Sequence, residues 1–363
     1  MRQNNIFLML LKVFFFSSIL VATSAVRAEL KVVTTIKPLH SLIANVMDGV
    51  GEPALIIEGS TSPHSFTLKP SHAKLLEEAD IIFWVGESIE TFMERPLESI
   101  VKNAEVVEFM EVESINKLKF REESIFEDHD DHDDHDDHDD HEDHDDHDDH
   151  DDHDDHDDHD DHDDHDDHDD HDDHDDHDDH DDHDDHSGHD HHGHAHGEFD
   201  AHIWLDPMNA KEMVHEIAHE LGDLDPANKN KYEANAQATI QALDQLVNDI
   251  EKGINKDAKF VVFHDAYQYF EERFGVRAAG ALTLNTDVLP GAKQIADIQD
   301  VIKDRGIKCI FSEPQFNPKI ITTIAEDMNI KTGVFDPLGA NIDSNKDLYF
   351  KLIQNLGNEL KGC

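Results

Sequence analysis

The stretch at residues 226–254, PANKNKYEANAQATIQALDQLVNDIEKGI, decides how this chain is organised. It has no proline after its first position and a single glycine, close to its end. Apolar side chains recur along it at the three- and four-residue spacing of an amphipathic helix, namely Tyr232, Ala236, Ile240, Leu243, Leu246 and Ile250. At about 1.5 Å per residue, such a helix is roughly 40 Å long, more than one small domain is wide. We therefore expect a rigid helix over 226–255 that joins two lobes.

Strand and helix patterns alternate on both sides of this helix. Short β-branched runs predict strands at 31–36, 54–58, 81–85, 105–109, 203–205, 260–263, 278–281, 309–311 and 332–335. Amphipathic stretches predict helices at 39–47, 70–78 (capped by Ser71), 88–100, 209–221, 292–304, 318–328 and 346–361. This alternation is typical of parallel sheets. We expect an α/β fold with two parallel-sheet lobes, residues 29–225 and 256–363.

An insert at 127–196 interrupts the first lobe and consists almost entirely of Asp-Asp-His repeats. It holds 41 acidic residues, 25 of the 32 histidines and no Lys or Arg. Such charge density repels itself and buries nothing, so we expect a disordered, extended loop. Imidazole beside carboxylate suits zinc and similar divalent ions, which predicts several weak, exchanging sites. The alternative is a solvating tract without a role in metal binding.

The charge balance excludes one class of partner, and the N-terminus indicates the compartment. Outside the insert, 44 acids against 29 bases leave an acidic protein, which excludes nucleic acid as a partner. Residues 1–28 read as a signal peptide, with Arg2, an apolar run and a cleavage site after Ala28. The alternative is a membrane anchor, but Lys12 interrupts the run. No cysteine near the cleavage site could carry a lipid, so we expect an exported protein that is not embedded in the membrane.

Two cysteines are present, Cys309 and Cys363. Export favours a disulfide between them. Closing a loop of about 55 residues would stabilise the fold by about 4 kcal/mol in the chain-entropy model. The alternative is two free thiols. A cysteine-based zinc site is not expected, because the chain has no CxxC spacing.

Seven histidines lie outside the insert, and their places relative to the predicted strands separate them. Ligands of open parallel sheets bind beyond the carboxyl ends of strands. Residues that follow predicted strands there are His64, His264, Glu313 and Asp336, and His202 opens the strand after the insert. Three imidazoles with a carboxylate or water form a tetrahedron that suits Zn²⁺. We predict an interlobe zinc site of His64, His202 and His264; His40 and His72 are assigned structural roles.

One motif favours a different function. His215, Glu216 and His219 form an HExxH sequence, and Asp225 extends it to a possible third ligand, as in a zinc protease. Apolar residues beside the histidines instead indicate ordinary helix packing, and Asp225 directly before Pro226 is typical of a helix cap. A secreted metalloprotease stays as the alternative.

Six motifs occur in order along the chain: TIKPLH (35–40), SPHSFTLKPS (62–71), AHIWLDP (201–207), FHDAY (263–267), SEPQF (312–316) and FDPLG (335–339). Together they resemble the periplasmic zinc-binding proteins of bacterial high-affinity zinc ABC importers. The resemblance runs from about Leu30 to Cys363. It implies two α/β lobes bridged by one rigid helix, zinc held in the cleft, and delivery to an inner-membrane permease with a cytoplasmic ATPase.

By motif, His64, His202 and His264 correspond to the zinc ligands of this family. Zinc-specific members have His at the third of these positions, where manganese relatives tend to carry Glu. The family also implies the His/Asp-rich loop and a disulfide like Cys309–Cys363. Some zinc members have Glu just before the first ligand, where this chain has Pro63. The fourth ligand is therefore Asp336 or water, and we prefer Asp336.

We expect a monomeric, non-enzymatic zinc carrier of the periplasm that uses no catalytic cofactor. Zn²⁺ is its transported ligand, and the His/Asp-rich loop is an auxiliary acceptor of low affinity. Besides the protease, two alternatives stay open: a manganese or iron carrier on the same scaffold, and a storage protein in which only the loop binds metal.

Overall fold

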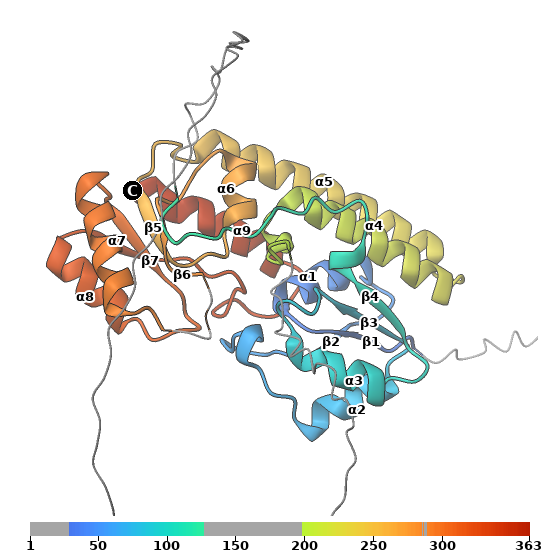
Figure 1. Ribbon diagram of the computed structural model, residues 1–363. Helices are drawn as coiled ribbons and strands as arrows, with labels where there is room; N and C mark the ends of the chain where they lie inside the picture. The colour runs from blue at the N-terminus through green and yellow to red at the C-terminus, as the bar shows by residue number, and fades with distance from the viewer. Residues whose placement is uncertain (1–28, 127–197, 285, 287–288) are drawn as a thin grey trace, which may run out of the picture. The chain divides into compact units, whose positions relative to one another are not determined.

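The structure, a computed structural model, describes residues 29–126, 198–284, 286 and 289–363. These residues form two four-stranded parallel sheets with flanking helices (Figure 1). The predicted α/β class with two parallel sheets is confirmed. The predicted signal peptide, its cleavage site and the His/Asp-rich tract lie outside the described residues. The predicted lobe boundaries stay predictions.

The first sheet has the strand order β2-β1-β3-β4. Its strands are β1 (Val32–Thr34), β2 (Ala54–Leu55), β3 (Ile81–Trp84) and β4 (Glu105–Glu108). Its helices are α1 (Lys37–Val46), α2 (Pro70–Glu78) and α3 (Glu94–Ser99), with short 3-10 turns η1 (Pro63–Ser65), η2 (Thr91–Met93) and η3 (Phe109–Glu111). Every residue of β3 is buried, as expected of a central parallel strand covered on both faces.

The second sheet repeats this plan with the order β6-β5-β7-β8. Its strands are β5 (Phe260–His264), β6 (Ala281–Thr283), β7 (Cys309–Ser312) and β8 (Lys331–Val334). The helices of this half are α6 (Gln268–Phe274), α7 (Ala292–Asp304), α8 (Lys319–Met328) and α9 (Leu348–Glu359), followed by η5 (Leu360–Gly362). A separate apolar cluster joins the sheet to α7 and α8 and includes Val261, Ile298, Ile310 and Ile321.

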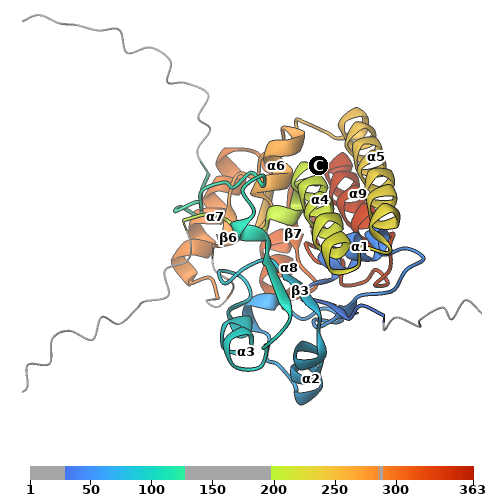
Figure 2. The same ribbon diagram turned by 90° about the vertical axis from the view of Figure 1, so that its right-hand side faces the viewer.

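Four packed helices connect the two sheets. The long helix α5 (Lys229–Gly253) has the predicted apolar stripe fully buried and is about 37 Å long. Helix α4 (Pro207–Leu224) lies along it, and α1 and α9 contact it from the two halves (Figures 1 and 2). One continuous apolar core runs from Val32 to Cys363. The expectation of a single joining helix was therefore incomplete, because the apolar faces of α1, α4 and α9 also close the junction.

Residues 203–205, predicted as a strand, form the 3-10 turn η4 (Ile203–Leu205). The Leu205 N–H donates to the His202 carbonyl at 3.0 Å, and all three side chains of the turn are buried. A short apolar run cannot be assigned to strand or helix by periodicity. The tertiary contacts decide its conformation.

Two other elements differ from prediction for local reasons. The helix expected at 88–100 is split into η2 and α3, because Pro96 has no N–H to donate and fits only the first turn of a helix. The strand expected at 278–281 begins only at Ala281. At Gly280 a Cβ would lie 2.7 Å from the Ser124 carbonyl oxygen, so the crossing segment 124–126 occupies that edge. Helix α6 was not predicted.

The predicted disulfide Cys309–Cys363 is present, with a Cα–Cα distance of 5.6 Å. It ties the C-terminal residue to the first residue of the buried strand β7. Among the described helices, none combines the length and the apolar character that crossing a bilayer requires.

Replacing Cys363 with Ser should lower the free energy of unfolding by about 4 kcal/mol, because the disulfide closes a loop with a sequence separation of 54. Urea unfolding measures this loss. The wild type in reducing buffer should lose as much; equal midpoints in oxidising and reducing buffer would contradict the stabilising role.

A fully buried carboxyl group closes the end of β3. The Glu90 Oε2 accepts hydrogen bonds from the Val85 and Gly86 N–H groups at 2.7 and 3.2 Å. Burial raises the pKa of Glu90 to about 7, although these bonds and one from Thr35 act in the opposite direction. Its folded pKa thus lies above the value of about 4.3 in an unfolded chain.

Glu90 should therefore weaken the fold as pH rises from about 4 towards 7, since the native state holds the proton more tightly. In Glu90→Gln, the free energy of unfolding should fall less steeply between pH 5 and 6.5, by about 1.4 kcal/mol per pH unit. Urea titrations with a metal chelator measure both slopes. Glu87→Gln, exposed on the same loop, is the control; identical slopes for Glu90→Gln and wild type would contradict the prediction.

Candidate metal centre

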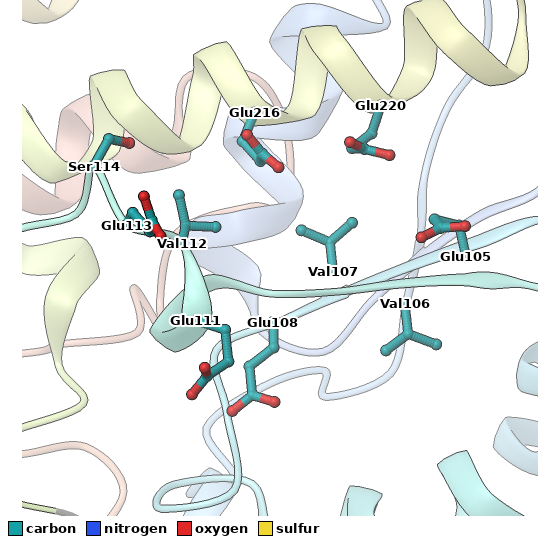
Figure 3. Close-up of a pocket in the computed structure, with 10 residues that line it drawn as sticks. All are labelled: Glu105, Val106, Val107, Glu108, Glu111, Val112, Glu113, Ser114, Glu216 and Glu220. Atoms are coloured by element: carbon teal, nitrogen blue, oxygen red, sulfur yellow. The ribbon is translucent and has the colours of Figure 1, made fainter.

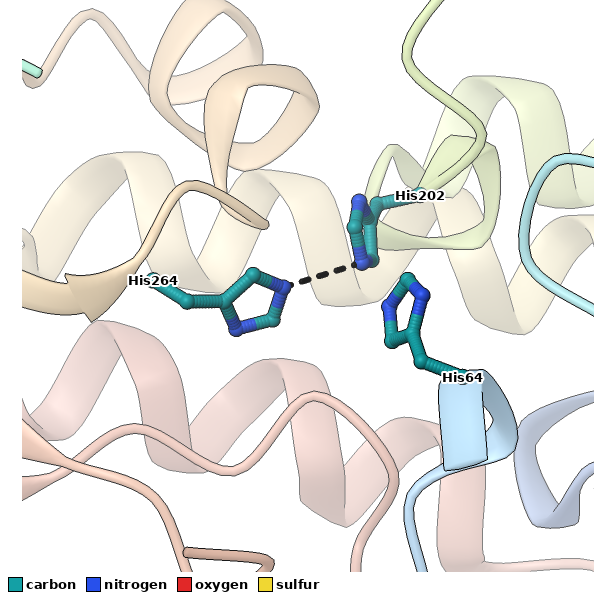
Figure 4. Close-up of side chains that lie close together, drawn as sticks. All are labelled: His64, His202 and His264. Atoms are coloured by element: carbon teal, nitrogen blue, oxygen red, sulfur yellow. Dashed lines mark hydrogen bonds between the residues drawn. The ribbon is translucent and has the colours of Figure 1, made fainter. Parts of the chain in front are cut away.

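Three imidazoles from distant parts of the chain converge between the two sheets. His64 lies in η1 after β2, His202 directly precedes η4, and His264 is the last residue of β5. One ring nitrogen of each lies within 4.8 Å of the others, and the rings face a common point (Figure 4). Within residues 29–126, 198–284, 286 and 289–363, no other group of three or more His, Cys, Asp or Glu meets this criterion. The structure thus brings together the three histidines predicted as ligands.

Two of these rings are held by carboxylates. The His202 Nδ1 lies 2.7 Å from the Asp200 Oδ1, and the His264 Nδ1 lies 2.8 Å from the Glu313 Oε1. A carboxylate can only accept, so each Nδ1 is the donor. Each Nε2 then carries a lone pair when its ring is neutral. Carboxylate support of this kind fixes the tautomer and orientation of metal-ligating histidines.

The two Nε2 atoms lie 3.3 Å apart. Two lone pairs at this distance repel each other unless a proton or a cation lies between them. Two Zn–N bonds of about 2.0–2.1 Å at a tetrahedral angle separate their nitrogens by about 3.3–3.4 Å. The spacing of the pair therefore fits a shared zinc-sized ion.

Two of the three imidazoles are buried, and His64 is half-buried. His202 and His264 are 5% and 3% exposed, and Asp200 and Glu313 are equally buried. The three rings line a cavity of about 10 Å³, whose other walls include Trp204, Phe316 and Leu338. This is about the space that one water-sized particle needs, so the cavity has room for a single small ion.

Buried carboxylates surround the site with negative charge. Beyond Asp200 and Glu313, the Arg121 guanidinium bonds to Asp265 at 3.0 Å and to Glu271 at 2.6 Å. Burial raises the pKa of Asp265 to about 7 and also raises that of Glu271. Burial lowers the pKa of His264, but Glu313 outweighs this and the net shift is upward. The raised pKa values of Asp265 and Glu271 reduce their charge near neutral pH. Together with Asp200 and Glu313, these carboxylates still outnumber the Arg121 guanidinium, and such a field favours a cation.

The segment that carries His202 is attached to the second half of the chain. The Tyr269 hydroxyl donates to the Asp200 carbonyl, and Arg273 donates to both oxygens of Asp206 at 2.6 and 2.7 Å.

Asp200, which supports His202, was not among the residues predicted from the sequence. Its position two residues before His202, inside the order Asp-Ala-His, was the available signal.

Asp336 does not join the three imidazoles. Its carboxylate accepts from the N–H groups of Leu338, Gly339 and Ala340 and from the side chain of Gln315. The structure thus does not support the expectation that Asp336 supplies the fourth ligand. The orienting bond to His264 comes from Glu313, a strand-end residue, because β7 lies next to β5.

The two histidines assigned structural roles stay away from the centre. The His40 Nε2 lies 3.2 Å from the Pro53 carbonyl oxygen. The His72 Nδ1 accepts from the Lys69 N–H, closing the first turn of α2. Ser71, expected as the helix cap, lies inside this turn, because the helix already begins at Pro70.

The HExxH residues do not form a metal site. His215 and His219 are exposed on α4, and the His219 Nδ1 lies 2.9 Å from its neighbour Glu220. Asp225 is buried at the end of α4, where it accepts from Asn228 and Tyr232. The N-cap of α5 is Asn228 and not Asp225.

Glu216, the possible base of the alternative enzyme, faces a different hollow. Figure 3 shows Glu216 and Glu220 pointing from α4 towards β4 and η3. This hollow of about 520 Å³ is lined by six glutamates and has no histidine in its walls. Burial, with Glu111 and Glu87 nearby, raises the pKa of Glu108 there to about 7. It lacks the imidazole donors that an HExxH enzyme requires.

Comparison with known proteins identifies the family. Residues 32–363 match the sequence model of the zinc-uptake complex component A, periplasmic (ZnuA). The chain belongs to this family. The high-affinity zinc uptake system protein ZnuA of Brucella abortus (strain 2308) is 47% identical over 334 residues, 92% of this chain and 91% of the relative. ZnuA of Haemophilus influenzae is 36% identical over 338 residues, 93% of each chain.

Solved structures share the fold. A crystal structure of ZnuA superposes with a TM-score of 0.63 at 19% identity, covering 91% of this chain and 98% of the other. The laminin-binding protein of Streptococcus agalactiae, described as having adhesin and metal transporting activity, gives a TM-score of 0.62 at 21% identity, with 92% and 100% coverage.

The predicted family is therefore confirmed. The relatives are uptake proteins, which confirms the expectation of a transport role rather than an enzymatic one. The family is described as periplasmic, in agreement with the expected export.

Proposed function

We propose that this chain is the zinc-binding component of an ABC importer. It captures Zn²⁺ between His64, His202 and His264 and delivers it to an inner-membrane permease driven by a cytoplasmic ATPase. The observation that carries this proposal is the buried pair of carboxylate-supported imidazoles, whose Nε2 atoms lie 3.3 Å apart. The relatives are named as zinc uptake proteins, which supports the same cargo.

The donor set favours zinc over manganese. Three imidazole nitrogens and no carboxylate oxygen make up the group found among the described residues. Imidazole suits zinc, whereas manganese prefers carboxylate and water oxygens. Because Asp336 is held by three backbone N–H groups, we propose water as the fourth ligand.

We further propose that the His/Asp-rich tract is an auxiliary zinc acceptor of low affinity. Its last histidine, His196, lies six residues before His202. The chain leaving the tract is fixed at once, since the Phe120 N–H donates to the Glu198 carbonyl and Phe199 pairs with Lys119. The C-terminal end of the tract is therefore the part of it that is nearest to His202 along the chain.

A chain in which residues 128–196 are replaced by a short linker should bind one zinc tightly, and His64→Ala/His202→Ala/His264→Ala should abolish that binding. Chelator-competition titration measures both. The matched control is His215→Ala/His219→Ala, which removes two exposed histidines and should keep the tight site.

Three results would contradict the proposal. Loss of all tight binding on removing the tract would favour the storage protein. Mn²⁺ outcompeting zinc would favour the manganese carrier. Peptide cleavage that disappears in Glu216→Gln would favour the protease.

Delivery to the permease is tested separately. In cells lacking their zinc-binding component, the wild-type chain should restore zinc accumulation and the triple variant should not.

Removing a supporting carboxylate should weaken zinc binding by about 10- to 100-fold, because the imidazole loses its fixed orientation and part of its basicity. Asp200→Asn and Glu313→Gln test this by competition titration on the tract-deleted chain. Glu220→Gln removes the same kind of contact from exposed His219 and should leave the affinity unchanged. An unaltered affinity in both buried variants would show that these bonds do not support the ligands.

A further inference from the structure

The loop between β8 and α9 forms one wall of the metal cavity. Two of its residues, Pro337 and Leu338, line the cavity directly. The Pro337 carbonyl also accepts a 2.8 Å hydrogen bond from the Trp204 Nε1, and the Trp204 ring packs against the His202 imidazole with centroids 5.3 Å apart. The position of this loop therefore affects how well the cavity is closed and, through Trp204, where the His202 imidazole lies.

Asp336 organises the loop from within. Its two oxygens gather the N–H groups of Leu338, Gly339 and Ala340 at 2.6–3.1 Å. Gly339 has a φ of +67°, in the left-handed region that favours glycine. Within this turn the Gly339 carbonyl accepts from the Ile342 N–H at 3.0 Å, and further donors to its carbonyls come from outside the turn.

Lys37 supplies those donors from the other half of the chain. Its Nζ donates to the carbonyl oxygens of Gly339, Ala340 and Ile342 at 2.6, 3.1 and 2.7 Å. An ammonium has three N–H bonds, so the three carbonyls use its full capacity. Lys37 is 5% exposed, and its helix α1 belongs to the first sheet's half of the chain.

This lysine is costly in its position. It is the first residue of α1, where the helix dipole disfavours a cation, and burial of an ammonium carries a further penalty. Burial lowers the pKa of Lys37, against the opposing effect of Asp336 and Asp343. Both the helix dipole and burial disfavour a charged lysine here. The hydrogen bonds to the three carbonyl oxygens compensate for these two effects.

The same face of α1 continues the contact. One turn after Lys37, the Ser41 hydroxyl donates to the Lys346 carbonyl at 2.9 Å. Two turns after it, the Asn45 side chain donates to the same carbonyl at 2.7 Å. Polar residues at i, i+4 and i+8 thus bind the connection between β8 and α9. Of these three, Lys37 binds closest in sequence to the cavity wall, because Gly339 directly follows the lining residues Pro337 and Leu338.

We infer that Lys37 is a positioning residue for zinc retention: it holds loop 336–342 as the wall of the cavity and thereby slows release of the ion without ligating it. The inference rests on the proposed zinc centre. Without the ammonium, the carbonyls of Gly339, Ala340 and Ile342 lose this donor, and among the described residues only that of Gly339 keeps another, the Ile342 N–H at 3.0 Å. The loop then loosens, and water gains access to the ion.

Lys37→Met keeps the length of the side chain and removes its charge. The full-length mature chain is loaded with zinc and mixed with excess chelator, and the slowest-released zinc, one per chain, is followed. Release should be about tenfold faster than in wild type, with association within twofold. The visible spectrum of the Co²⁺-loaded variant should match wild type, because the ligands are the same. A merely misfolded fraction would lower the number of sites but not the release rate of the remaining ones.

Lys346→Met is the matched control. Lys346 also spans the junction, pairing with Asp48 at 2.7 Å, but both side chains are about half exposed. Its release rate should stay within twofold of wild type. Asp336→Asn loosens the same loop from within, so it should also speed release. The double variant Lys37→Met/Asp336→Asn should release zinc at most about twofold faster than the faster of the two single variants. The two effects should not multiply, because both residues act on one loop.

The outcomes separate this inference from the proposed function. A wild type without one slowly released zinc overturns the zinc centre itself. A wild type that retains zinc, with Lys37→Met within twofold of it, overturns only the role of Lys37. Multiplicative effects in the double variant would also overturn it. If Lys37→Met does not fold, Asp336→Asn decides. A zinc release rate equal to that of the wild type in Asp336→Asn would then overturn the role of Lys37.

Discussion

The hydrogen bonds from Asp200 to His202 and from Glu313 to His264 are the interactions on which the centre depends. Each uses one nitrogen of a buried imidazole and so directs the other nitrogen at the same point. Two lone pairs 3.3 Å apart are unfavourable in a low-dielectric cavity without positive charge between them. The fold can hold them there because both histidines are attached to the same half of the chain, through β5, Tyr269 and Arg273.

The rest of the architecture holds the two halves of the chain together around this arrangement. Helices α1, α4, α5 and α9 share one apolar core with both sheets, so the two halves cannot separate widely without exposing it. His64 reaches the centre from the first half, on the short turn η1. Lys37 crosses the same junction to the loop beside the ion. The carboxylates around Arg121 complete an anionic shell that a divalent cation would neutralise.

Much of this could be predicted, for identifiable reasons. The stripe from Tyr232 to Ile250 predicted α5, because helix periodicity sustained along most of a 25-residue helix is hard to mistake. His64 and His264 were found because parallel strands place their carboxyl ends at one edge. The strand expected at 203–205 was wrong, because three apolar residues have no readable period. Asp336 was preferred to water as the fourth ligand because it matches the carboxylate of related proteins, and Glu313 was noted only as a residue that follows a strand.

The sequence by itself determined the class of fold, the family, the disulfide partners and the three histidines, since these follow from local periodicity, residue type and ordered motifs. Only the tertiary structure decided that Glu313 supports His264, because a hydrogen bond between residues 49 apart depends on strand order and not on spacing. It also decided against the HExxH helix. The same i, i+4 pair can ligate or lie in solvent, and the burial of the opposite face of α4 left His215 and His219 outside.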